Sequence, residues 1–217
     1  MVSIAKKWIM AFSGLFLCLF LVGHLAGNLI LLKCGPGTEQ AFNDYAEFMT
    51  TNPAVQGLRI LTFLSVGLHV IFSIILTMKN KAARSQKYAY SAGNTNSAWN
   101  SRYMAVLGII TLLFVGVHLK MFMIKSTFCE VDSLYALVIT SFKDPITVVF
   151  YVLCMAALSF HLGHGFSSAF QSLGLRHKKY TPMIEKAGAA FAILVPLGFA
   201  AIPVFVFFCK CGTSCAA

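Results

Sequence analysis

Five of the six histidines lie inside long apolar segments of the sequence: His24, His69, His118, His161 and His164. A side chain with unmet hydrogen bonds is costly in hydrocarbon, so each one either bonds to a neighbouring helix or serves a site. Proton relays in membranes usually include carboxylates, and none joins these histidines. Metal ligation by imidazole needs only histidines. The pattern therefore favours a metal-binding role shared by four successive segments.

The segments that hold these histidines are long enough to cross a membrane. Cutting the sequence at its charges predicts helices at about residues 8–32, 58–78, 103–124, 146–174 and 187–209. About 20 residues, at about 1.5 Å each, cover a hydrocarbon core of about 30 Å. Because 58% of the residues are hydrophobic and only 11% are charged, a soluble globular protein is excluded. We expect an all-α, multi-pass membrane protein with a single transmembrane domain over residues 1–217, in which the first four helices form a bundle.

The charges predict the orientation of the helices. The net charge of +10 sits in short connections rather than on one helix face, which indicates a role in topology and no binding of nucleic acid. With the N-terminus inside, these basic residues fall on the inner side: Lys6, Lys7, Lys79, Lys81, Arg84, Lys87, Arg102, Arg176, Lys178, Lys179 and Lys186. We therefore expect the N-terminus in the cytoplasm and the C-terminus outside. The first outer loop contains an amphipathic pattern at about residues 39–51, which predicts a helix lying at the membrane interface.

Two of the histidines are expected at the same depth near the outer side. His24 lies 17 residues beyond Lys7, and His118 lies 16 beyond Arg102. At 1.5 Å per residue these positions are about 26 and 24 Å from the inner flank. The two side chains therefore form a level pair.

A second pair is expected nearer the inner side. His69 precedes Lys79 by 10 residues, and His164 precedes Gly174, a predicted helix terminator, by 10. Both positions are about 15 Å in, whereas His161 would lie about 19 to 20 Å in. Since His161 and His164 share a helical face, depth is the only criterion that separates them, and it favours His164.

Two bis-histidine pairs at two depths are the arrangement that holds two b-type haems one above the other. The motif C-x-x-C-H is absent, so covalently attached c-type haem is excluded. Haem propionates need cations near the rims, and Arg59, Arg102 and Lys120 are the candidates. Each of the three could equally be a flanking residue that reaches the membrane surface.

Several stretches of the sequence resemble one family, the cytochrome b membrane anchor of respiratory complex II. These are KWIMAFSGL at residues 7–15, GHLAGN at 23–28, GLH at 67–69, GVH at 116–118 and FHLGHGFSSAFQSLG at 160–174. The resemblance covers nearly the whole chain and is to the single-subunit, five-helix, two-haem type of succinate dehydrogenase or fumarate reductase.

The resemblance implies the ligands and the partners. The axial ligands would be His24 with His118 and His69 with His164. Some members carry a carboxylate two residues before the last ligand, where this chain has Leu162, so no proton route is expected there. The implied partners are a flavoprotein and an iron–sulfur protein, bound at the basic inner face, together with membrane lipid and a quinone, menaquinone or menaquinol, near the outer haem. The implied location is the bacterial cytoplasmic (inner) membrane, with a dimer of heterotrimers as a possible assembly.

Quinol oxidation releases protons, so a base is expected close to the quinone. Of the acids in the first outer loop, Glu47 lies between Tyr45 and Phe48 on the predicted interfacial helix, and it is the predicted proton acceptor. Its alternative is a solvated carboxylate opposite the apolar face.

Two other functions remain open from the residues. The chain could be a di-haem anchor of a different quinone-linked enzyme, such as a nitrate reductase or formate dehydrogenase, which co-purified flavin would separate. It could also be a transporter or structural membrane protein without haem, in which the histidines bond helices together; an optical spectrum would separate that case.

Overall fold

The computed structural model describes residues 4–33, 35–82, 102–129 and 131–209, and these residues form helices with no strand among them. Within this described part of the chain, five helical stretches are long and apolar enough to cross a membrane: Ile4–Leu32, Pro53–Ala82, Met104–Phe128, Pro145–Ser172 and Thr181–Phe208. The prediction of an all-helical, multi-pass membrane protein with five spanning helices is confirmed to this extent. Which end faces the cytoplasm stays a prediction from the charges.

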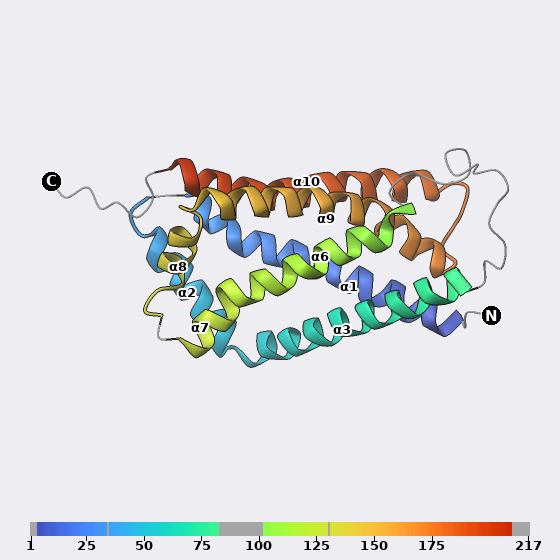
Figure 1. The fold of residues 1–217 in the computed structure, drawn as a ribbon, viewed down its shortest axis with the longest axis horizontal. Helices are drawn as coiled ribbons and strands as arrows, with labels where there is room; N and C mark the ends of the chain where they lie inside the picture. Colours follow the sequence, from blue (N-terminus) through green and yellow to red (C-terminus); the bar gives the residue numbers. More distant parts are fainter. Residues whose placement is uncertain (1–3, 34, 83–101, 130, 210–217) are drawn as a thin grey trace.

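The long helices lie side by side, and we name the two ends of the array by the chain (Figure 1). At the N end α1 begins, α3 ends and α9 connects to α10; at the C end α10 ends, and the short helices α2 and α8 lie there. The helices are α1 (Ile4–Asn28) with the 3-10 turn η1 (Leu29–Leu32), α2 (Thr38–Thr51), α3 (Pro53–Ala82), α6 (Met104–His118), the π-helix η2 (Leu119–Ile124), α7 (Lys125–Phe128), α8 (Leu134–Ser141), α9 (Pro145–Ser172) and α10 (Thr181–Phe208).

Local signals in the sequence explain where α9 begins and ends. At its start, the Asp144 carboxylate accepts a hydrogen bond of 2.9 Å from the N–H of Thr147, which satisfies a free donor of the first turn. At its end, Gly174 adopts a left-handed conformation with φ of 76°. The N–H of Leu175 then bonds back to the carbonyl of Phe170 at 3.0 Å. The predicted termination at Gly174 is confirmed.

The helices are packed unevenly. Helix α9 packs against α10, α1 and α6, whereas α3 packs mainly against α1. One third of the apolar stretch of α9 and of α10 is buried (33% each), against 6% in α3 and in α6. Most of the surface of α3 and α6 is therefore left for lipid or for a bound group.

A polar network joins α2 to α8 across the C end. The Asn43 amide oxygen accepts the N–H of Tyr135 at 3.0 Å, and its amino group donates to the Ser133 hydroxyl at 2.9 Å. That hydroxyl in turn donates to the Glu39 carboxylate at 2.8 Å. The network covers an apolar core that contains Leu31, Phe42, Tyr135, Val138, Ile139, Phe142, Val148, Tyr151, Ile202 and Val206.

Candidate functional site: two histidine pairs

Four histidines from four different helices face one another in two pairs. The ring centroids of His24 on α1 and His118 on α6 are 5.8 Å apart, with the ring planes at 87°. Those of His69 on α3 and His161 on α9 are 6.3 Å apart, with the planes at 67°. Each pair thus joins helices that are not consecutive in the chain.

The separations fit two imidazoles on opposite sides of one metal ion. With about 2 Å from each nitrogen to a metal and about 1 Å from each nitrogen to its ring centre, the two centroids would lie about 6 Å apart. A pair supplies only two ligands, so a metal held there takes its other ligands from elsewhere, as haem iron does from the four porphyrin nitrogens. The donors present fit a bis-histidine haem at each pair.

Only part of the predicted pairing is reproduced by the ring contacts. The His24 and His118 rings meet as the depth count predicted, but the ring that meets His69 belongs to His161 rather than to His164. The physical reason lies in the helix ends. Helix α3 continues to Ala82, 13 residues beyond His69, whereas α9 ends at Ser172, 11 residues beyond His161 and 8 beyond His164. Counted from these ends, His161 is closer in depth to His69.

A glycine of α1 makes room for the His69 ring of the second pair, and a glycine of α6 lies in ordinary contact distance of the His161 ring. A Cβ atom at Gly14 on α1 would lie 3.3 Å from Cε1 of His69, and one at Gly108 on α6 would lie 3.6 Å from Cε1 of His161. A larger side chain at Gly14 would therefore push the His69 ring from its position.

Hydrogen bonds orient two of the four rings. The Ser13 hydroxyl donates to the carbonyl of Met10 at 3.1 Å, and its oxygen lies 3.4 Å from Nδ1 of His69. Since the hydroxyl proton is already used, Nδ1–H of His69 is the donor, and Nε2 keeps its lone pair for a metal. The Nδ1 of His118 has a comparable partner in the hydroxyl of Tyr151, at 3.2 Å.

The Nδ1 atom of His161 is buried and has no hydrogen-bond partner among the described residues. An unpaired buried nitrogen costs free energy, on the order of 1–3 kcal/mol, and calls for a reason such as an absent ligand. Binding of a metal at Nε2 fixes the proton on Nδ1 and leaves a donor that a propionate or a water could satisfy. The orphaned nitrogen therefore agrees with a cofactor at this pair.

Aromatic side chains enclose the His24/His118 pair. Phe20 stacks on His24 at 5.3 Å, and Phe199 of α10 lies 5.7 Å from the same ring. Phe114 stacks on His118 at 5.7 Å. These rings exclude water and leave an apolar surround suited to a flat hydrophobic group.

The cations predicted to meet propionates are exposed. Arg59 lies on the second turn of α3 and Lys120 lies in η2, both toward the C end, while Arg102 precedes α6 at the N end. Their positions place two cations at the end of the first pair and one at the other end. Contact with a propionate stays a prediction for each.

Glu47 lies on the exposed face of α2. Tyr45, two residues earlier, points to α1 so closely that a Cβ atom at Gly27 would overlap its phenol ring. Two residues turn a helix by about 200°, so Glu47 points away from α1. An exposed position is compatible with a solvated carboxylate and also with a base that contacts a quinone at the membrane interface. The role of Glu47 as a proton acceptor stays a prediction.

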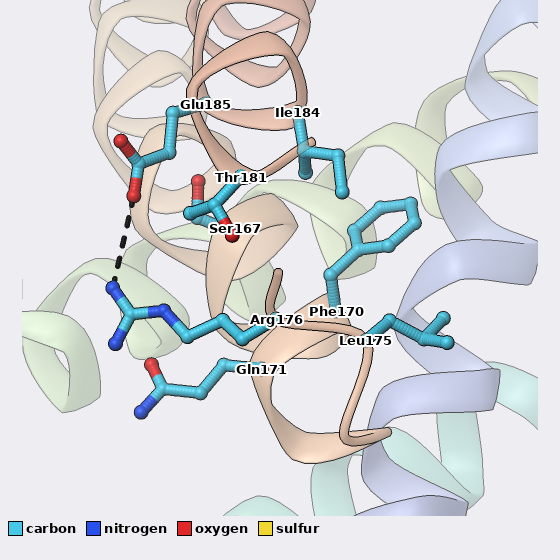
Figure 2. A pocket seen from close by; sticks show the side chains of 8 residues that line it. All are labelled: Ser167, Phe170, Gln171, Leu175, Arg176, Thr181, Ile184 and Glu185. Atoms are coloured by element: carbon cyan, nitrogen blue, oxygen red, sulfur yellow. Dashed lines mark ion pairs between the residues drawn. The ribbon is translucent and has the colours of Figure 1, made fainter. Parts of the chain in front are cut away.

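A small pocket lies one turn of α9 beyond His164, at the N end (Figure 2). It has a volume of about 30 Å³ and is lined by residues that include Ser167, Gln171 and Thr181. At its rim Arg176 and Glu185, both exposed, form an ion pair at 3.8 Å. The space suits about one water molecule and not a quinone.

Two polar partners of the histidines, Ser13 and Tyr151, were not predicted from the sequence. A hydroxyl inside an apolar span indicates a hydrogen bond to another helix. Other serines and tyrosines in the spans give the same indication, so it does not single out these two. Their pairing with His69 and His118 depends on the rotation of each helix, which spacing alone does not give.

Comparisons of the chain with protein-family models, with curated proteins and with solved structures found no match. The fold and the site by themselves define a class: a multi-pass helical membrane protein that carries two histidine pairs inside its spanning helices.

Proposed function

We propose that this chain is the di-haem cytochrome b anchor of a succinate:quinone oxidoreductase, that is, of a succinate dehydrogenase or quinol:fumarate reductase. The observation that carries the proposal is the meeting of four histidines from four spanning helices in two pairs at metal-ligand separations. The resemblance of residues 7–15, 23–28 and 160–174 to that family supports the choice among di-haem proteins. Dicarboxylate chemistry belongs to a partner chain.

The ligand set of the proposal is His24 with His118, and His69 with a histidine of α9. For that histidine, depth and the family resemblance favour His164, whereas the ring contact favours His161. When bound, two b haems supply one-electron transfer between an iron–sulfur partner at the N end and a menaquinone at the C end. Ser13 orients the His69 ring through its contact with Nδ1, and the phenylalanines around the first pair exclude water.

The remaining parts of the proposal concern the two ends of the molecule. By the positive-inside rule the N end faces the bacterial cytoplasm, where the basic residues of α1, of the 79–102 connection and of 176–186 would dock the iron–sulfur protein. Residues 83–101 of that connection, and residues 1–3, lie outside the described part of the chain. At the C end, Glu47 would accept protons from quinol, while Arg59 and Lys120 would meet propionates there and Arg102 would do so at the N end.

The experiment is purification of the complex by a tag on this chain in mild detergent. We expect flavin and non-haem iron to co-purify, and succinate to reduce the b-type absorbance and a menaquinone analogue. If b haems are present but no flavin co-purifies, and formate or another donor reduces them, the chain is the anchor of another quinone-linked enzyme. If no b-type spectrum is found, the haem-binding proposal itself is wrong.

A further inference from the structure

One tyrosine on α9 contacts a histidine of the first pair. The Tyr151 hydroxyl lies 3.2 Å from Nδ1 of His118 and donates to the sulfur of Met121 at 3.9 Å. A thioether can only accept a hydrogen bond, and a hydroxyl has a single proton. When Nε2 of His118 binds a metal, the ring proton is on Nδ1, so Nδ1–H donates to the phenol oxygen and the phenol keeps its own proton for the sulfur.

The phenol is held rigidly. Tyr151 is 5% exposed, and its ring packs edge to face against Phe114 and Phe142, each at 5.0 Å. Phe114 also stacks on the His118 ring. Because these side chains keep water from the hydrogen bond, it is stronger than the same contact would be in solvent.

The backbone changes its winding at this point. Helix α6 ends at His118, and the π-helix η2 begins at the next residue. A π-turn takes an additional residue per hydrogen-bonded turn, so it rotates the following side chains away from their α-helical positions, and such turns occur often at functional sites. Here the rotated segment carries Met121, which receives the Tyr151 proton, and Phe122, whose ring lies 5.4 Å from that of His118.

The second pair has a weaker counterpart. The Ser13 oxygen is 3.4 Å from Nδ1 of His69, a longer contact, and Nδ1 of His161 has no hydrogen-bond partner among the described residues. The two pairs therefore differ in the strength of the hydrogen bond that the protein offers to Nδ1–H. Such a difference can give two chemically identical haems different reduction potentials.

We propose that Tyr151 is a positioning residue that sets the reduction potential of the haem held by His24 and His118. By accepting the Nδ1 proton, the phenol fixes the His118 ring and makes its Nε2 a stronger electron donor, which favours the oxidised iron and lowers the potential. The inference rests on the proposed function, because it needs a haem at this pair.

The test is a redox titration of both haems in the purified complex carrying Tyr151→Phe. We expect one of the two midpoint potentials to become more positive while the other stays at its wild-type value. We also expect haem transfer from that site to apomyoglobin to become faster by about tenfold, the usual cost of losing such an outer partner. Ser13→Ala should move the other potential in the same direction.

Tyr135→Phe is the matched control, because Tyr135 lies in the same apolar core, packs on Phe42 and contacts no histidine of the described residues. It should leave both potentials unchanged. A second variant, Met121→Leu, keeps the phenol but removes the acceptor of its proton, and it should move the same potential as Tyr151→Phe by a smaller amount. The inference is overturned if Tyr151→Phe and Met121→Leu both titrate like Tyr135→Phe. A wild-type complex without two b haems would instead overturn the proposed function.

Discussion

The imidazole rings of His69 and His161 face each other at 6.3 Å, while His164, one turn further along α9, has no ring contact with His69 among the described residues. We therefore predict that His161→Ala removes one of the two haems and that His164→Ala retains both. Haem content per chain in the two purified variants checks this. Loss of a haem in His164→Ala, with both retained in His161→Ala, would restore the pairing expected from depth alone.

The contact between Tyr45 and Gly27 makes a prediction about stability. A methyl group at Gly27 would overlap the Tyr45 ring, so Gly27→Ala should separate α2 from α1 and destabilise the protein by about 1–3 kcal/mol. Gly23→Ala is the control, because a Cβ atom at Gly23 would meet no atom of another described element within 4 Å. Thermal unfolding in detergent should show a lower Tm for Gly27→Ala only. Equal Tm values for the two variants would show that α2 does not dock on α1 through this contact.

The cap of α9 makes the stability depend on pH. Hydrogen bonds from the hydroxyl and the backbone N–H of Thr147 hold the pKa of Asp144 below its ordinary value of 3.8. A carboxyl whose pKa is lower in the folded state stabilises the fold above its unfolded pKa, and this contribution disappears as the pH falls through the folded value. Asp144→Ala should therefore lower Tm at neutral pH and differ little from wild type well below pH 3.8.

The control for the cap is Asp132→Ala, since Asp132 is an exposed acid that precedes α8 and caps no helix. It should leave Tm unchanged at neutral pH. A Tm deficit in Asp144→Ala that is the same at every pH would mean that the carboxylate charge contributes nothing to the cap.

Glu47 provides a test of the quinone chemistry. If it accepts protons from quinol, Glu47→Gln should lower quinone turnover by about 10²- to 10⁴-fold, while both haems and the succinate activity with an artificial acceptor remain. Asp44→Asn, at another exposed acid of α2, should keep normal turnover. Near-normal quinone turnover in Glu47→Gln would place the proton acceptor elsewhere.

The spanning helices could be predicted because charges interrupt the apolar sequence only between these helices and near their ends. Helix α8 could not, since its eight residues are too few to show a period and adjoin the next apolar span. The π-helix η2 could not be predicted from the residue types, because it differs from an α-helix in its hydrogen bonding and not in its composition. It carries α6 on through α7 to Phe128, past the predicted end at residue 124.

The histidines of the site could be identified from the sequence, but not all of their partners. Depth placed His24 and His118 together because both were counted from flanks at the same end. The depth count placed His161 and His164 only about 4.5 Å apart. Helix α3 continues three residues beyond Lys79, which changes the depth counted for His69 by the same amount. The contact of Tyr151 with His118 depends on the rotation of α9, which residue spacing does not define.

The central claim is that the chain holds two b haems, one at each histidine pair. A pyridine haemochrome assay with protein quantitation on the purified wild-type complex tests it most directly. We expect two b haems per chain and a reduced-minus-oxidised spectrum of low-spin b type. A ratio near one, or no such spectrum, would contradict it.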